Sequence, residues 1–264
     1  MKRLTWLLPS SQVVLVCLLA AQGAGAEVLK WRTDGVQREA LVLAPSKADE
    51  SGKAPVVFAF HGHGGDMQQA ADAGLQNFWP EAVVVCMQGL PTKIYVDPAG
   101  LEPGWQQEPG QNGDRDLKFF DAVLATLRSK FAVDERRIYA TGFSNGGIFA
   151  YLLWGTRAKT FAAFASVAGE IFPGVHLAEP KPLLQVAGEA DDVVPFAKQL
   201  RSIQVARKLN GSTGKGEECG PHCTIYRSSK GAPVETYIHP GGHVWPLEAP
   251  AVIVKFLRSY VRAQ

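Results

Sequence analysis

The chain has 264 residues with a formal net charge of +2, of which 46% are hydrophobic and 20% charged. This composition excludes an intrinsically disordered chain, and the four cysteines are too few for a disulfide-dense scaffold. No block of like charge suggests a tail that binds nucleic acid, and the length suffices for one domain with its own core.

The first residues have the pattern of a secretory signal peptide. Lys2 and Arg3 precede an apolar run over residues 13–21, and Ala24-Gly25-Ala26 offers a small-x-small cleavage site. The run is short for a permanent membrane helix. Cys17 raises the alternative of a lipoprotein, but valine and leucine precede it where that signal requires a small residue. We expect residues 1–26 to be a leader and residues 27–264 to form a single secreted domain.

The expected domain has no excess charge. Both leader cations count among the 27 basic residues of the chain, so their removal leaves as many basic residues as there are acidic ones, 25. Electrostatics therefore favour neither a nucleic acid nor an anionic membrane as a partner.

Strand and helix signals alternate beyond the leader. Two strand patterns, at residues 27–32 and 38–43, flank a Thr-Asp-Gly turn and predict a hairpin. Continuous apolar runs at residues 55–60 and 82–87 are typical of parallel strands covered on both faces. Apolar residues then recur at helical spacing between residues 117 and 127.

The second half continues the alternation. Its predicted elements are strand 137–141, helix 145–158, strands 163–168 and 183–187, helix 196–208, strand 234–238 and helix 249–262. A hairpin followed by such alternation predicts a three-layer α/β fold with a mostly parallel central sheet. Ligands of these sheets bind beyond the carboxyl ends of the strands.

A nucleophile motif follows the strand at residues 137–141. Gly142-Phe143-Ser144-Asn145-Gly146 is a G-x-S-x-G elbow between a strand and a helix. The residues two before and two after the serine face each other closely, so both positions require glycine. The motif alone also describes a glycine-rich turn with a capping serine, but its strand-turn-helix context favours Ser144 as a nucleophile.

Two later strand ends offer an acid and a base. Asp191 follows strand 183–187, and its spacing to a following Val-Pro pair favours it over Asp192, which is expected to be solvated or to cap a helix. His243 follows strand 234–238 in a loop from which an imidazole can reach Ser144, whereas His239 is expected to be structural. The chain order Ser144, Asp191, His243 is that of the α/β-hydrolase triad.

Two backbone N–H groups are expected to form an oxyanion hole. One belongs to Asn145, directly after the serine, and the other is assigned to His63 in the glycine-rich loop after strand 55–60. His61 and His63 also raise the alternative of a metal site, but further ligands at metallohydrolase spacing are missing from the sequence. We expect neither a metal nor a cofactor.

The cysteines have separate expected roles. Cys86 lies in the apolar run 82–87 and is expected to be a buried thiol. Cys219 and Cys223 lie in a Gly/Pro loop and are expected to form a disulfide, which export allows. A zinc site that includes His222 is the alternative.

Together these motifs resemble the secreted esterases that include polyhydroxybutyrate depolymerases, feruloyl esterases and acetylxylan esterases. The resemblance is carried by residues 60–64, 133–147, 161–163, 188–195 and 241–246. It implies an α/β-hydrolase fold and a serine carboxylic-ester hydrolase that uses Ser144, Asp191 and His243. Paired cysteines before the last strand, as in Cys219 and Cys223, are frequent in that family.

Three departures from the family pattern leave the substrate open. His63 stands where relatives often have cysteine, Ala187 where histidine is frequent, and Phe196 where tyrosine is common. Polyhydroxybutyrate-type oligomers or polymers and feruloyl or acetyl esters of plant polysaccharide are all compatible with the motifs. Trp105 and Trp245 are candidates for the aromatic walls of the substrate site, with ordinary packing as the alternative.

Ester hydrolysis through an acyl-enzyme is therefore the expected function, with no partner other than the ester substrate. Two alternatives stay open. One is an exported polysaccharide- or polymer-binding protein without turnover on a hydrolase scaffold, and the other is a serine peptidase or thioesterase, because triad chemistry also acts on amides and thioesters.

Overall fold

The computed structural model describes residues 25–263. The predicted leader lies outside the described residues, apart from its last two. The strands are β1 (Ala26–Thr33), β2 (Val36–Leu43), β3 (Ala54–Phe60), β4 (Val83–Met87), β5 (Leu90–Pro91), β6 (Pro103–Gly104), β7 (Val133–Phe143), β8 (Ala163–Val167), β9 (Leu183–Gly188), β10 (Glu217–Gly220), β11 (Cys223–Tyr226) and β12 (Val234–His239). The α-helices are α1 (Met67–Asp72), α2 (Leu75–Phe78), α3 (Arg115–Lys130), α4 (Asn145–Arg157), α5 (Phe196–Asn210) and α6 (Ala249–Arg258).

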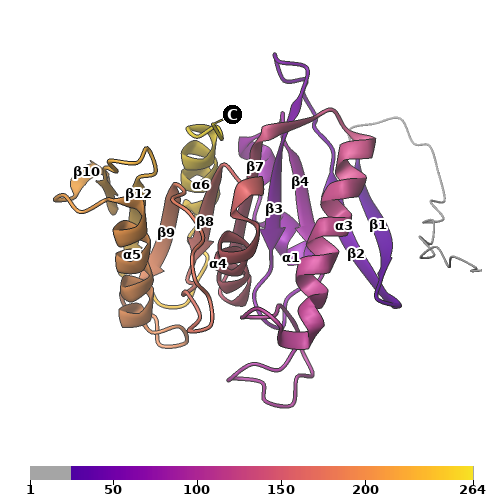
Figure 1. Cartoon of the computed structure of the whole chain (residues 1–264), viewed down its shortest axis with the longest axis horizontal. Coiled ribbons are helices and arrows are strands. Elements are labelled where there is room, and N and C mark those ends of the chain that lie inside the picture. The colour runs from indigo at the N-terminus through magenta and orange to yellow at the C-terminus, as the bar shows by residue number, and fades with distance from the viewer. Residues whose placement is uncertain (1–24, 264) are drawn as a thin grey trace, which may run out of the picture.

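Ten strands form one sheet in the order β1-β2-β4-β3-β7-β8-β9-β12-β11-β10 (Figure 1). The six central strands, from β4 to β12, pair in parallel, and an antiparallel pair closes each edge. Four of these parallel strands, β3, β4, β8 and β9, are almost entirely buried, as their continuous apolar sequences require.

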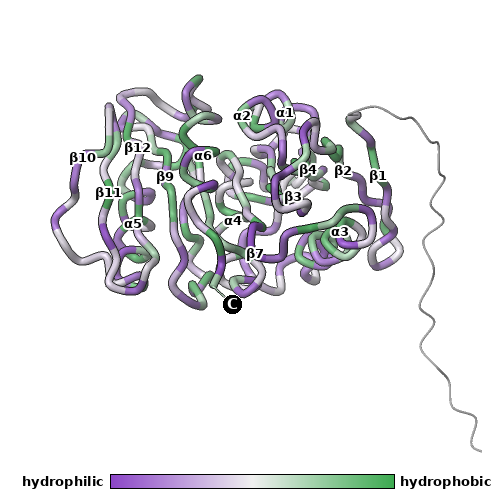
Figure 2. Tube along the Cα trace, turned by 90° about the horizontal axis from the view of Figure 1, so that it is seen from above, coloured by the Kyte–Doolittle hydropathy of each residue, from purple (hydrophilic) through white to green (hydrophobic). Residues whose placement is uncertain are grey.

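Helices cover both faces of this sheet. Buried side chains of α3, α4 and α5 pack on one face, and those of α1, α2 and α6 pack on the other, so that two apolar cores sandwich the strands. The layers can be followed from above in Figure 2, where α1, α2 and α6 lie on the opposite side of the sheet from α3. The predicted three-layer architecture with a mostly parallel sheet is confirmed. Between residues 25 and 263, no helix has the length and apolarity to cross a membrane.

The segment around the paired cysteines differs from its prediction as a loop. It forms the antiparallel hairpin β10–β11, which extends the sheet beyond β12. All residues of these two short strands are exposed or half-buried, so they show no alternation of apolar and polar side chains from which a strand could be predicted.

Candidate active site

The carboxyl ends of three parallel strands bring the predicted triad together. Ser144 follows β7, Asp191 lies beyond β9, and His243 lies beyond β12. The Nε2 atom of His243 is 2.8 Å from Ser144 Oγ, and its Nδ1 atom is 2.8 Å from Asp191 Oδ2. A serine, an imidazole and a carboxylate in this relay can transfer a proton away from the hydroxyl as it attacks a carbonyl.

Ser144 occupies a strained turn. Its backbone has φ 53° and ψ −119°, outside the conformations that L-residues favour, and its N–H donates to the Val167 carbonyl at 2.8 Å. A Cβ on Gly142 would lie 2.5 Å from the Gly146 backbone, and a Cβ on Gly146 would collide with the Phe60 carbonyl. Glycine at both positions therefore permits the turn that projects the serine from the start of α4.

The Asp191 carboxylate is completely buried and fully hydrogen-bonded. Its Oδ1 atom accepts from the backbone N–H groups of Val193 and Val194 at 3.0 and 2.9 Å. Its Oδ2 atom accepts from Gln199 Nε2 at 2.8 Å and faces His243. These donors hold the carboxylate in one orientation and compensate the loss of solvation of its charge.

The two residues predicted as oxyanion donors, Asn145 and His63, line one hollow together with Ser144. Within the described part of the chain, the backbone N–H groups of Asn145 and His63 donate to no backbone or side-chain acceptor. The Asn145 side chain is occupied separately: its Oδ1 accepts from the Trp105 N–H at 2.6 Å, and its Nδ2 donates to the Trp105 carbonyl at 3.1 Å. The arrangement leaves both backbone donors available to a substrate oxygen.

The His63 side chain bonds its loop to the segment between β5 and β6. His63 Nε2 lies 3.1 Å from Asp97 Oδ2, which also accepts from the Glu102 N–H. These hydrogen bonds, led by that from Glu102, lower the pKa of Asp97. The backbone of the loop is held as well, because Gly64 N–H donates to the Pro103 carbonyl at 2.8 Å.

The prediction of Trp105 as a wall of the substrate site is wrong. The side chain is completely buried, stacked on Phe149, and its indole N–H donates to the His61 carbonyl at 2.9 Å. A ring without exposed surface cannot contact a substrate. Trp105 instead holds the backbone around the predicted oxyanion donors. Its indole bonds to His61 in the loop after β3, and its backbone forms two hydrogen bonds with the Asn145 side chain.

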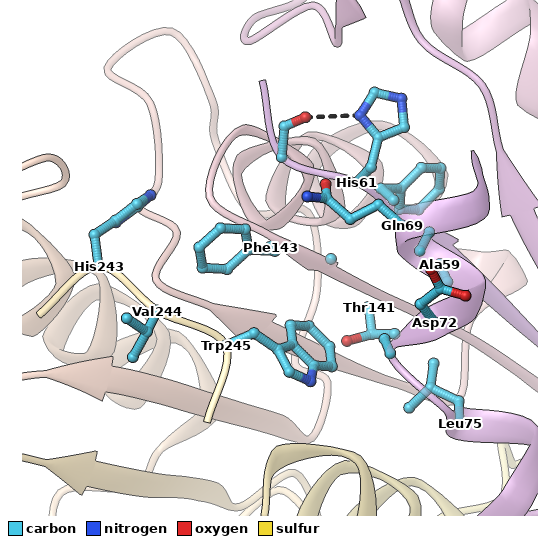
Figure 3. A pocket seen from close by; sticks show the side chains of 15 residues that line it. Ala59, His61, Gln69, Asp72, Leu75, Thr141, Phe143, His243, Val244 and Trp245 are labelled. Atoms are coloured by element: carbon cyan, nitrogen blue, oxygen red, sulfur yellow. Dashed lines mark hydrogen bonds between the residues drawn. The ribbon is translucent and has the colours of Figure 1, made fainter. Parts of the chain in front are cut away.

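Trp245 does line a cavity, as Figure 3 shows. This cavity of about 430 Å³ lies between α1 and the loop that carries His243, and its walls are mostly apolar. The Phe143 ring lines it, and the ring centroids of His243 and Trp245 lie 4.9 and 6.4 Å from the Phe143 centroid. Two buried polar atoms of its lining, Thr141 Oγ1 and Trp245 Nε1, have no hydrogen-bond partner among the described residues.

A second hollow of about 290 Å³ opens directly above Ser144. It shares Gly62, Phe143 and His243 with the first cavity, so these three residues border both spaces. Its rim contains Tyr95, which is 98% exposed, and further apolar side chains that the sequence analysis missed, namely Ile94, Val96, Phe172 and Val193. The segment with residues 94–96 has no regular periodicity, so nothing in the sequence marked it.

The other histidines considered from the sequence have structural positions. His61 is buried, its Nδ1 lies 2.7 Å from the Gly62 carbonyl, and its Nε2 accepts from the Gly89 N–H at 2.9 Å. Both nitrogens are thus engaged, which leaves no lone pair for a metal, and burial lowers the pKa of the ring. His239 accepts from the Gly241 N–H at 3.1 Å, and burial lowers its pKa too.

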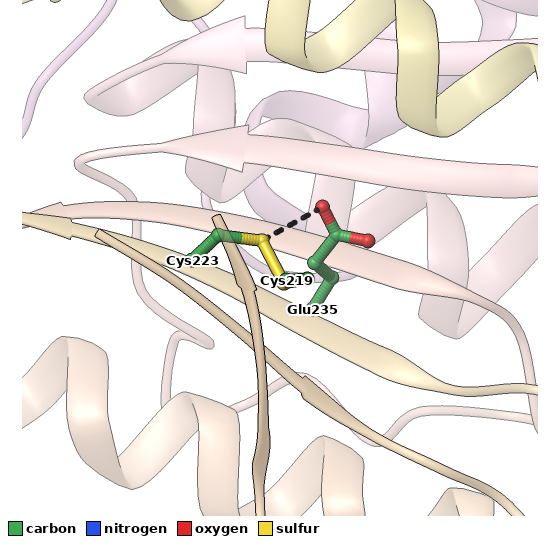
Figure 4. A group of neighbouring side chains, drawn as sticks. All are labelled: Cys219, Cys223 and Glu235. Atoms are coloured by element: carbon green, nitrogen blue, oxygen red, sulfur yellow. Dashed lines mark hydrogen bonds between the residues drawn. A yellow bond between two sulfur atoms is a disulfide. The ribbon is translucent and has the colours of Figure 1, made fainter. Parts of the chain in front are cut away.

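Cys219 and Cys223 form a disulfide at the β10–β11 hairpin, as Figure 4 shows. A carboxyl oxygen of Glu235 lies 3.5 Å from Cys223 Sγ, and burial raises the pKa of this glutamate. These three side chains form a cluster of potential metal ligands, but the two sulfur atoms are bonded to each other. The disulfide lies at the edge of the sheet opposite β1. Cys86 is a buried free thiol.

Comparison with known proteins gives feruloyl esterases as relatives. The chain is 29% identical over 217 residues to a probable feruloyl esterase C of Aspergillus clavatus, which covers 78% of this chain and 75% of the relative. It is 28% identical over 224 residues to feruloyl esterase D of Neurospora crassa, covering 80% and 75%. The model of the prolyl oligopeptidase family matches residues 102–172, the segment that contains the serine elbow.

Solved structures with the same fold include other esterases. An acetyl xylan esterase from Aspergillus awamori superposes with a TM-score of 0.64 at 13% identity, covering 89% of this chain and 99% of that one. A ferulic acid esterase superposes with a TM-score of 0.62 at 16% identity, covering 89% and 97%. These likenesses identify the α/β-hydrolase fold. The chain therefore has the α/β-hydrolase fold and is similar in sequence to proteins named as feruloyl esterases.

Proposed function

We propose that the chain is a secreted serine esterase that cleaves feruloyl-type aromatic esters through an acyl-enzyme on Ser144. The observation that carries the serine mechanism is the unbroken relay from Ser144 Oγ through His243 to Asp191, with both links at 2.8 Å. The strained elbow and the two free backbone donors support it, because they supply an exposed nucleophile and a place for the oxyanion.

In this mechanism, Ser144 Oγ attacks the ester carbonyl while His243 Nε2 takes its proton. The carbonyl oxygen becomes an oxyanion and accepts hydrogen bonds from the N–H groups of Asn145 and His63, each worth about 3 kcal/mol in the transition state. Collapse of this intermediate breaks the ester bond, and His243 protonates the departing alcohol. Water, activated by the same imidazole, then attacks the acyl-serine, releases the carboxylic acid and restores Ser144.

We assign the aromatic acyl group to the cavity behind Phe143. Its apolar walls suit a phenyl ring, and the Trp245 indole offers an aromatic contact. An acetyl group would fill little of a space of about 430 Å³. The relatives named as feruloyl esterases point to the same substrate class.

Substrate preference tests this assignment directly. We expect ethyl ferulate to be hydrolysed with a higher kcat/KM than hydroxybutyrate oligomers, acetylated xylan or a peptide amide, measured in parallel. Trp245→Ala should lower kcat/KM for ethyl ferulate about tenfold through loss of the aromatic contact, and should change hydrolysis of nitrophenyl acetate little. Leu247→Ala, two residues further and exposed, is the matched control. Equal losses of kcat/KM on both esters in Trp245→Ala would argue against the assignment of the acyl group to this cavity. A higher kcat/KM on the oligomers or the peptide amide than on ethyl ferulate would show that the proposed substrate class is wrong.

Export rests on the leader pattern alone, from Lys2 to Ala26. We expect the protein recovered outside the cytoplasm to begin near Glu27, because the small residues at positions 24 and 26 fit a signal-peptidase site. N-terminal sequencing of the exported protein measures this. An intact Met1 on a protein retained in the cytoplasm would overturn the proposal of secretion and leave the ester chemistry untouched.

A further inference from the structure

The acid of the triad is the end of a longer chain of buried hydrogen bonds. Tyr151 Oη donates to Gln185 Oε1 at 2.6 Å, Gln185 Nε2 donates to Gln199 Oε1 at 3.3 Å, and Gln199 Nε2 donates to Asp191 Oδ2 at 2.8 Å. Both glutamine residues have no exposed surface, and Tyr151 has 1%. This series of hydrogen bonds connects α4, which starts after Ser144, with β9, α5 and the loop that holds Asp191.

The orientation of both amides follows from their other partners. Gln199 Nε2 also donates to the Val194 carbonyl at 2.8 Å, and a carbonyl can only accept. Gln185 Nε2 has three acceptors for its two hydrogens, the carbonyls of Gly169 and Val186 at 3.1 and 3.3 Å and Gln199 Oε1 at 3.3 Å, so its bond to Gln199 is shared with these carbonyls. A flipped amide would therefore place two acceptors against each other in either residue.

The first donor of the chain is equally determined. Burial raises the pKa of Tyr151 far above its ordinary value, so the phenol keeps its proton. Every link then donates in the direction of Asp191. Aligned dipoles in a water-free site strengthen one another, and their positive end meets the carboxylate.

The burial of these polar side chains costs free energy of hydration, and packing alone does not explain why they are present. Buried amides stabilise a fold no better than apolar side chains of equal size, because each must recover its lost hydration through hydrogen bonds. Gln199 is unreachable for a substrate, since its side chain is completely buried. Besides Gln185 and the Val194 carbonyl, its amide contacts the carboxylate oxygen of Asp191 that faces His243.

We propose that Gln199 is a positioning residue for the reaction, held in place by Gln185 and Tyr151. Its amide fixes Asp191 Oδ2 toward His243 Nδ1 and stabilises the carboxylate as an anion. The inference rests on the proposed triad. It adds that Asp191 supports the full kcat only when Gln199 donates to its Oδ2 atom. The two backbone N–H groups that hold its Oδ1 atom are not sufficient.

The test replaces Gln199 by methionine, which has nearly the same shape but no donor. Loss of a hydrogen bond to a charged group predicts a fall in kcat of about 10- to 100-fold, with KM within about twofold because no substrate contact changes. The far-downfield proton resonance of the bond between His243 Nδ1 and Asp191 should broaden or vanish. The variant's kcat should fall by the same factor on ethyl ferulate and on nitrophenyl acetate.

Asn210→Leu is the matched control. Asn210 is a completely buried amide on the same helix, bonded to the Lys181 backbone, and it lies roughly 16 Å from Gln199 by helical rise. Its replacement should lower the melting temperature without changing kcat. Wild-type kcat in a folded Gln199→Met protein, or an equal loss of kcat in Asn210→Leu, would overturn the inference.

A second variant distinguishes the effect of the hydrogen bond to Asp191 from the effect of side-chain packing. It also tests the proposal if Gln199→Met does not fold. Gln199→Glu keeps the shape but donates to Asp191 only while the introduced carboxyl is protonated. The ratio of its kcat to that of the wild type should therefore fall as the pH rises, and a ratio independent of pH would contradict the proposal. Tyr151→Phe, which removes a single hydroxyl, should lower kcat only a few-fold. Ser144→Ala in the same assay shows separately whether the serine mechanism itself holds.

Discussion

Ser144→Ala is expected to lower kcat for ester hydrolysis about a million-fold while the protein stays folded. Without Oγ no acyl-enzyme can form, and only the oxyanion donors and binding remain to accelerate attack by water. Alanine meets the same backbone strain as serine at φ 53°, so the stability should change little. Hydrolysis of nitrophenyl acetate measures the loss, and a fluorophosphonate probe should label wild-type Ser144 alone.

Ser129→Ala is the matched control for this variant. Ser129 is an exposed serine on α3 whose hydroxyl donates only to the Thr126 carbonyl. It should retain wild-type activity and labelling. Most of the activity surviving in Ser144→Ala would disprove the mechanism, and wild-type protein that is folded but takes up no probe would favour a binding protein without turnover.

Asp191→Asn is expected to lower kcat about ten-thousand-fold. The carboxylate accepts from His243 Nδ1, and this keeps the Nε2 lone pair directed at Ser144. An asparagine amide that donates to Nδ1 would place the imidazole proton on Nε2, where it cannot accept the serine proton. KM should change little, because Asp191 is buried away from both hollows. Steady-state kinetics on ethyl ferulate separate the two parameters.

Asp192→Asn is the natural control, since the same substitution is made one residue further along. Asp192 is exposed, and within residues 25–263 its carboxylate forms no hydrogen bond or ion pair. Its kcat should stay within about twofold of the wild type. A large loss in Asp192→Asn together with a mild one in Asp191→Asn would reverse the assignment of the acid.

Local chemistry explains why the candidate triad was predictable. Glycine at positions 142 and 146 is a local requirement of the serine turn, visible in five consecutive residues. The acid and the base each follow a strand, and parallel strands bring their carboxyl ends to one edge. Knowing that the strands are parallel was therefore enough to expect that Ser144, Asp191 and His243 would meet.

The substrate walls were not predictable in this way. Trp105 and Trp245 both stand near glycine and proline and look alike in sequence. One is completely buried under the oxyanion loop and the other borders a cavity, because Phe149 on α4 covers the first ring and α1 leaves space beside the second. Tyr95 is exposed on the rim of the second hollow in a segment that the His63–Asp97 hydrogen bond ties to the loop after β3.

The sequence by itself determined the alternation of strands and helices, the layered fold and the order of the candidate catalytic residues. These follow from periodicity and from short motifs, whose physical requirements lie within a few residues. The tertiary structure alone decided which tryptophan is buried, which residues border both hollows, and that Gln199, Gln185 and Tyr151 stand behind Asp191. The three side chains come from α4, β9 and α5, with Tyr151 34 residues from Gln185 and Gln185 14 residues from Gln199, so only the packing of these elements puts each donor against its acceptor.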